Sequence, residues 1–103
     1  LRANLNWEDL PILPSALGYA QRGYNTGAAN RNWASFGLNI TVPDDMEQWQ
    51  KNMLTDPQTS GGLMVSCPPN QAAKIIELFH AQGYHFAKQI GSMETGVAHV
   101  TVM

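Results

Sequence analysis

The sequence predicts a domain of the α+β or α/β class, in which a mixed sheet packs against helices. Near both ends of the chain, short segments alternate apolar and polar residues every second position, which is the period of a half-buried strand. Between them, apolar residues recur at helical spacing, most regularly over 72–79. Proline and glycine separate these segments and mark the turns. At 103 residues the chain is one domain at most.

The first half of the chain is predicted to run strand, helix, loop and short helix. Residues 1–6 alternate in the strand period, so we expect the chain to begin inside a strand whose normal neighbours lie in missing upstream sequence. A helix is predicted after Pro14, and Gly23 is placed to end it. Residues 24–29 indicate a loop, and residues 31–36 a single helical turn.

A strand and a second amphipathic helix are predicted next. Residues 38–42 alternate in the strand period. Asp44 or Asp45 then offers an N-cap for a helix that Pro57 must end. One face of this helix carries its large apolar residues, Met46, Trp49 and Met53.

The middle of the second half predicts a buried strand followed by a helix. Residues 63–67 form a short apolar run that suits a buried central strand, and two prolines end it. Asn70 can cap the helix that follows, and Gly83 is placed to close that helix in a left-handed conformation.

The chain is predicted to end in two strands. Alternation over 86–90 and again over 98–102 favours this, with residues 92–96 as the turn between them.

Composition excludes several classes of partner. The formal charge is −2, and the 6 Lys+Arg are scattered singly, which argues against a nucleic-acid-binding surface. The single cysteine cannot form an intramolecular disulfide, and no apolar run approaches the ~20 residues needed to cross a bilayer. We therefore expect a cytoplasmic protein with no nucleic-acid or membrane partner.

No catalytic residue and no metal ligand is predicted. Cys67 ends an apolar run with no basic neighbour, so burial is favoured over reactivity. The three histidines lie on different predicted elements and lack the spacing of zinc ligands. The paired Asp44 and Asp45 are more typical of helix capping than of cation binding.

The segment from Asp56 to Gly62 is the strongest candidate for function. Two glycines and a proline build a loop that can expose backbone amides, and its side chains bring several oxygens to one turn. A phosphate could lie against such a loop, although it lacks the lysine of a P-loop and precedes a strand. A purely structural turn explains the same residues. The candidate phosphate-facing residues are Thr59, Ser60, Gly61 and Gly62, with Asn30, Asn32, Asp56 and Gln58 as weaker candidates.

Four segments, in this order, resemble selenophosphate synthetases (selenide, water dikinases). They are Leu10-Pro11-Ile12-Leu13-Pro14-Ser15-Ala16, Gly27-Ala28-Ala29-Asn30-Arg31-Asn32 with Trp33-Ala34-Ser35-Phe36, Asp56-Pro57-Gln58-Thr59-Ser60-Gly61-Gly62-Leu63, and Pro68-Pro69 with the later Ile90-Gly91. The family has Gly-Gly-Thr where this chain has Gly27-Ala28-Ala29. The resemblance covers essentially the whole chain.

The resemblance implies the fold of the C-terminal domain of aminoimidazole ribonucleotide synthetase-like enzymes. It implies that residues 1–103 are part of that domain, in a longer enzyme that uses ATP and Mg²⁺ to make selenophosphate from selenide, with release of AMP and phosphate. In the family, the nucleophilic cysteine or selenocysteine, its lysine and the magnesium-binding aspartates lie upstream. The isolated chain is therefore expected to hold no cofactor and to be inactive.

The resemblance also implies partners. The first is the N-terminal ATP-binding domain of the same polypeptide, and the whole protein is expected to be a homodimer. The isolated chain is expected to self-associate through an unpaired strand edge at residues 1–6. Two alternatives stay open. One is a non-catalytic scaffolding or binding domain, and the other is a different superfamily member, such as a hydrogenase-maturation or thiamin-phosphate kinase relative.

Overall fold

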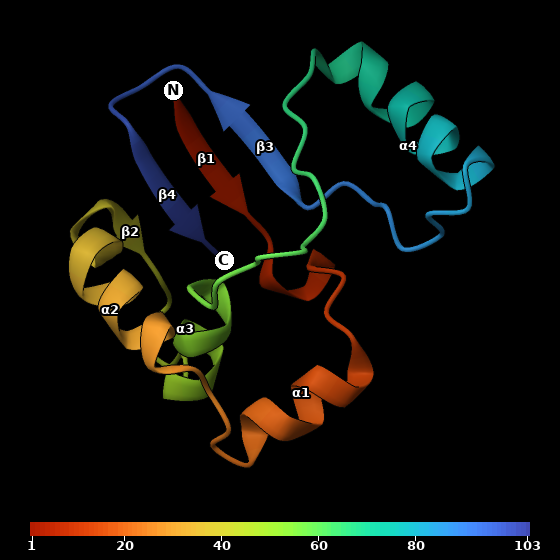
Figure 1. Cartoon of the computed structure of the whole chain (residues 1–103). Coiled ribbons are helices and arrows are strands. Elements are labelled where there is room, and N and C mark those ends of the chain that lie inside the picture. Colours follow the sequence, from red (N-terminus) through yellow and green to blue (C-terminus); the bar gives the residue numbers. More distant parts are fainter.

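The computed structural model describes residues 1–103, which form four α-helices and a four-stranded sheet (Figure 1). The helices are α1 (Pro14–Gln21), α2 (Gly27–Phe36), α3 (Gln48–Leu54) and α4 (Ala72–Ala81). The strands are β1 (Arg2–Leu5), β2 (Ile40–Thr41), β3 (Gly91–Glu94) and β4 (His99–Val102). Three short 3₁₀ helices are η1 (Trp7–Asp9), η2 (Gly37–Asn39) and η3 (Pro69–Gln71). A mixed sheet with helices confirms the predicted α+β class.

The first strand lies in the interior of the sheet. The strand order is β2-β4-β1-β3, so β1 has a parallel neighbour in β4 and an antiparallel neighbour in β3. The predicted strand at the start of the chain is confirmed, but the expectation that it has an unpaired edge is wrong. Its partners come from the other end of the sequence, and alternation within 1–6 could not reveal them.

The first of the two predicted final strands is displaced in the structure, whereas the second, predicted at 98–102, is confirmed as β4. The third strand is Gly91–Glu94 rather than 86–90, and the turn follows it at 95–98. Pairing with β1 sets this register, which places Leu5 opposite Gly91 and Arg2 opposite Glu94. The two final strands are not neighbours, because β1 lies between them (Figure 1).

The predicted buried strand at 63–67 is absent. The segment has no regular structure, and Leu63, Met64 and Val65 are 85%, 77% and 51% exposed. An apolar run becomes a strand only where a neighbour pairs with it, and no strand of this chain does so. The strand predicted at 38–42 is likewise reduced to β2, because η2 takes up its first part.

The helix boundaries differ from those predicted where a different capping residue is used. α2 begins at Gly27, inside the predicted loop, because the Thr26 hydroxyl accepts a hydrogen bond from Ala29 N. α3 begins later than predicted, after Glu47, which forms a capping box with Gln50.

The glycine stops are confirmed, whereas the predicted cap of the last helix is not. Gly23 and Gly83 have φ of 87° and 91° and follow α1 and α4. Asn70 lies in η3, and no side chain caps α4.

Three of the four helices, α1, α2 and α3, form one packed group. α3 packs against α1 and α2, and the Trp7 and Trp49 rings meet edge to face at 5.8 Å. The expectation that Met46 lies on α3 is wrong, because it precedes that helix. The buried residues are few: Ala20, Ala29, Met46 and Val102. The chain therefore encloses only a small core of its own.

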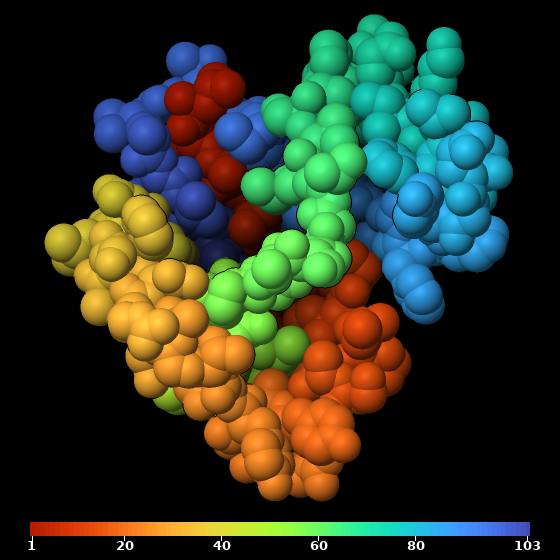
Figure 2. All heavy atoms as spheres, in the orientation of Figure 1, coloured from red at the N-terminus to blue at the C-terminus, as the bar shows by residue number.

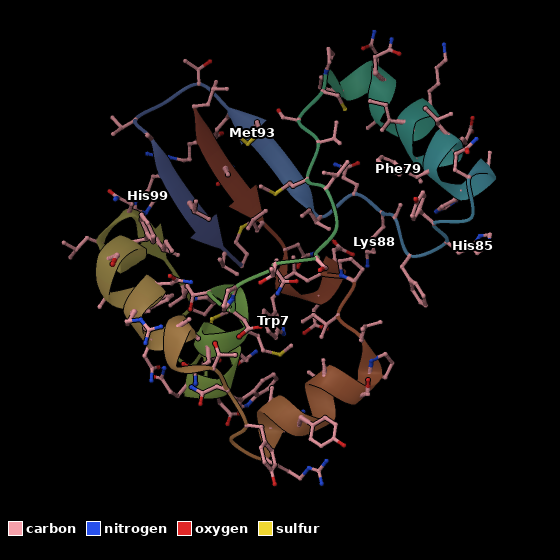
Figure 3. All side chains as sticks on the ribbon, viewed as in Figure 1. Trp7, Phe79, His85, Lys88, Met93 and His99 are labelled. Carbon is pink, nitrogen blue, oxygen red and sulfur yellow. The ribbon has the colours of Figure 1, made fainter.

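One ion pair ties the segment after α4 to η1. Lys88 Nζ lies 2.9 Å from Asp9 Oδ1, and Figure 3 shows Lys88 on the segment that returns from α4. Hydrogen bonds from Lys88 and from Asn6 hold the pKa of Asp9 below its ordinary value of 3.8.

The pKa of Asp9 predicts a pH-dependent contribution to stability. Because the folded-state pKa is lowered, the stabilisation is fully present above the unfolded value and is lost as pH falls through the folded value. Lys88→Met should therefore lower the melting temperature at neutral pH, and its difference from wild type should shrink in acid. Lys74→Met, on exposed α4 surface, is the matched control. A difference that stays constant across thermal melts from about pH 7 to about pH 2 would contradict the assignment.

Candidate functional site

The base of the loop at 56–62 is fastened to α2 by side-chain hydrogen bonds. The Thr26 hydroxyl donates to Asp56 Oδ1 at 2.9 Å, and Asn32 Nδ2 donates to the Thr55 carbonyl at 2.8 Å. The Thr55 hydroxyl lies 3.1 Å from the Ala29 carbonyl oxygen and 3.0 Å from that of Lys51. The structure thus brings together two motifs that lie more than twenty positions apart in the sequence.

The tip of the loop is a tight turn from Gln58 to Gly61. Gly61 N donates to the Gln58 carbonyl oxygen at 3.2 Å, which closes the turn. Thr59 and Ser60 are its two central residues, and both are exposed. Neither hydroxyl has a hydrogen-bond partner within the chain. Two consecutive residues with unpaired, exposed hydroxyls therefore occupy the tip of a loop whose base is held by hydrogen bonds.

The two glycines of the loop, Gly61 and Gly62, differ in whether the structure has room for a side chain. Neither has a positive φ, so backbone conformation requires neither of them to be glycine. At Gly61, an added Cβ would lie 2.6 Å from the Gln58 Cβ, so the closeness of the turn excludes a side chain. At Gly62, an added Cβ would meet no atom within 4 Å. Only Gly61 is required by the loop as it stands.

The weaker candidate residues divide into structural and free groups. Asn32 and Asp56 hold the loop base through the hydrogen bonds to Thr55 and Thr26, whereas Asn30 is exposed and makes no side-chain hydrogen bond. Gln58 Nε2 donates to the Asp56 carbonyl oxygen at 3.4 Å. Sequence reasoning missed Thr26, although a threonine directly before a helix is a typical N-cap.

A cleft opens beside the base of the loop. Its volume is about 360 Å³, and α1, the segment before α2, α3 and the start of the loop line it. Tyr19, Tyr24 and Trp49 contribute aromatic rings, while Asp56 and Gln58 lie where the loop begins. The Arg22 guanidinium lies 4.7 Å from the centre of the Tyr19 ring. The loop therefore forms part of a concave surface.

The histidine, cysteine and acidic side chains of the chain do not form a second candidate site. Nowhere do three His, Cys, Asp or Glu side chains gather as metal ligands would. His80 Nε2 lies 2.8 Å from the Ala87 carbonyl oxygen. His99 Nε2 lies 2.8 Å from the Thr41 hydroxyl, and Figure 3 labels His99. Cys67 is half-buried and unpaired. None of the helices has the length and apolar character to span a bilayer.

Comparison with known proteins finds several relatives that share one name. No protein-family model matches the chain. It is 44% identical over 103 residues to a protein of Dechloromonas aromatica named selenide, water dikinase, and 41% identical over 103 residues to one of Rhizobium meliloti with the same name. A Paraburkholderia xenovorans protein of that name is 43% identical over 103 residues. All of the chain is matched in each case, and it spans about 30% of the length of these relatives.

Proposed function

We propose that this chain, a homologue of selenide, water dikinases along its whole length, is the C-terminal part of such an enzyme. The observation that supports the proposal most is the 44% identity over all 103 residues to a relative of that name. The relatives extend well beyond the matched region, so the activity proposed belongs to the whole protein. Residues 1–103 would form most of its C-terminal α/β domain, with an ATP-binding domain upstream.

The reaction proposed for the whole protein consumes ATP, selenide and water. It yields selenophosphate, AMP and inorganic phosphate. Such phosphoryl transfer needs Mg²⁺ to neutralise charge, and it needs groups that position the reacting phosphate. This chain would help to position the reacting phosphate, and other parts of the polypeptide would bind the metal.

The side chains of this chain do not suit a magnesium site of their own. The carboxylates nowhere gather as a cluster of ligands, and Asp56 accepts a hydrogen bond from Thr26 at the loop base. The loop holds no lysine to pair with a phosphate. The contribution proposed for this chain therefore involves no metal bound by its own residues.

The tip of the loop suits a phosphate or its bound water. Thr59 and Ser60 are exposed and have no partner within the chain, so both hydroxyls are free to donate to an anion. The hydrogen bonds of Thr26 and Asn32 fix the loop base, which reduces the entropy lost when the loop orients a ligand. We propose that Thr59 and Ser60 line one wall of the active cleft of the whole protein.

A chimera and the isolated chain together test this proposal. In the chimera, this chain replaces the matched segment of the Dechloromonas aromatica relative. The chimera should form AMP from ATP in a selenide-dependent reaction. Calorimetric titration of the isolated chain with Mg²⁺ and ATP should show no binding at micromolar levels, a Kd that corresponds to about 8 kcal/mol. Saturable binding to the isolated chain would contradict the placement of the nucleotide site outside it.

A further inference from the structure

The stretch from Leu63 to Phe86 leaves a large share of its apolar side chains uncovered. We refer to residues 63–86 as the apolar arm. Six of the fifteen large apolar residues that are exposed lie within it: Leu63, Met64, Val65, Leu78, Tyr84 and Phe86. Figure 2 shows the first part of the arm as a ridge that stands out from the front of the molecule. Such a concentration of exposed apolar residues in one stretch of the chain is typical of an interaction surface rather than of the usual scatter of single residues.

The helix within the arm has no partner for its apolar face. Ile75, Ile76 and Phe79 lie on one side of α4 at helical spacing, yet none of them is buried. The only element with which α4 makes extensive contact is η3, which directly precedes it. Figure 1 shows α4 at the side of the molecule, away from α1, α2 and α3. An amphipathic helix of this kind is stabilised mainly by packing, and this chain supplies little.

The accessible surface area of the whole chain is also larger than that of a folded monomer of the same mass. A folded monomer of 11.3 kDa exposes about 5,700 Å², whereas this chain exposes 7636 Å². The excess is about 1,900 Å², and an interface between domains of one polypeptide buries roughly 600–1,500 Å². The chain therefore has more than enough surplus surface to accommodate one such interface.

We propose that the apolar arm is the docking surface for the part of the same polypeptide that lies outside these residues. This inference rests on the proposed function, in which the chain is a segment of a longer enzyme. More than two thirds of the length of the relatives lies outside the matched region, so a covering domain is available in the same molecule. The arm carries only two residues of fixed charge, Lys74 and Glu77, which suits a permanent apolar interface.

The proposed interface covers the apolar arm and leaves other exposed apolar residues of the chain in solvent. Leu38, in η2, is 96% exposed but lies outside the arm. The Asp9–Lys88 ion pair joins η1 to the segment just beyond the arm. A domain that docks on the arm would therefore cover Leu63, Leu78 and Phe86 and leave Leu38 in solvent.

Hydroxyl-radical footprinting of the whole protein tests the proposal with internal references. After correction for intrinsic reactivity, Leu63, Leu78 and Phe86 should be modified about tenfold more slowly than Leu38, because the centre of an apolar interface excludes water. Met64, now 77% exposed, should react as slowly as Met46, which is 7% exposed and thus buried within this chain. Rates for the arm similar to that of Leu38 would overturn the proposal.

Dilution and activity separate the alternative outcomes. Protection by the same polypeptide should persist on dilution to the monomer, as light scattering reports it. Loss of protection on dilution would mean that a second copy covers the arm, and would overturn the assignment. Leu78→Asp should expose the arm to footprinting, whereas Leu38→Asp should not. Full protection of the arm in a protein without selenide-dependent activity would support the docking surface and contradict the proposed function.

Discussion

Replacing Thr59 and Ser60 together by alanine is expected to lower selenophosphate formation about a hundredfold in the chimera, with little change in melting temperature. Each hydroxyl is expected to donate a hydrogen bond to a charged phosphate, an interaction that contributes about 1.5–3 kcal/mol, and about 1.4 kcal/mol corresponds to a factor of ten in rate. Neither hydroxyl has a hydrogen-bond partner within the chain, so the folded state loses no internal hydrogen bond. Steady-state kinetics and thermal melts of the same samples measure both effects.

Two matched variants make the result specific. Ser15→Ala removes an exposed hydroxyl at the start of α1, and Ser92→Ala removes an exposed hydroxyl from β3. Both should keep wild-type turnover. If the double variant also keeps wild-type turnover, the loop is a structural turn and the assignment of Thr59 and Ser60 is wrong. A lowered melting temperature without lost turnover would lead to the same conclusion.

Gly91→Ala is expected to cause the largest loss of stability of any single methyl added to this chain. An added Cβ at Gly91 would collide with the carbonyl oxygen of Asn4 on the neighbouring strand and would lie 3.0 Å from the Cα of Leu5. The clash is with backbone, which cannot rotate away, so β3 must move from β1. Overpacking costs typically 1–3 kcal/mol, and we expect about 3 kcal/mol or more from denaturant titration of the whole protein.

Gly18→Ala is the matched control for that loss. Gly18 lies within α1, where an added Cβ meets no atom within 4 Å. Alanine there should raise stability by about 0.5–1 kcal/mol, since glycine is a poor helix former. If both variants change stability equally, the observed pairing of β1 with β3 is wrong.

Local patterns predicted the elements whose residues suffice to form them. The helix ends at Gly23 and Gly83 follow from residues that accept positive φ, and both occur where predicted. Alternation in the first residues predicted β1 for the same local reason. Neither prediction needed to know what the element packs against.

The failures concern elements that depend on distant partners. Residues 63–67 have the composition of a buried strand, yet this chain offers no strand to pair with them. The third strand begins at Gly91 because it pairs with β1, a choice that alternation over 86–90 does not show. Long-range pairing lies outside what a single sequence reveals through local periodicity.

The candidate site was predicted in part, for a similar reason. The exposed turn at Thr59 and Ser60 follows from local turn chemistry. The hydrogen bonds of Thr26 to Asp56 and of Asn32 to Thr55 join segments whose contact only the fold reveals. Asn32 was therefore predicted as a ligand candidate, while the structure gives it a position at the loop base.

Phosphorus-31 NMR of the chimera with ATP, selenide and Mg²⁺ tests the central claim most directly. If this chain completes a selenide, water dikinase, the spectrum should show selenophosphate, identified by coupling of phosphorus to selenium-77, together with AMP and inorganic phosphate. The reaction without selenide should show no selenophosphate. A correctly folded chimera that forms no phosphorus–selenium bond, in an assay where the unaltered relative does, would contradict the proposed function.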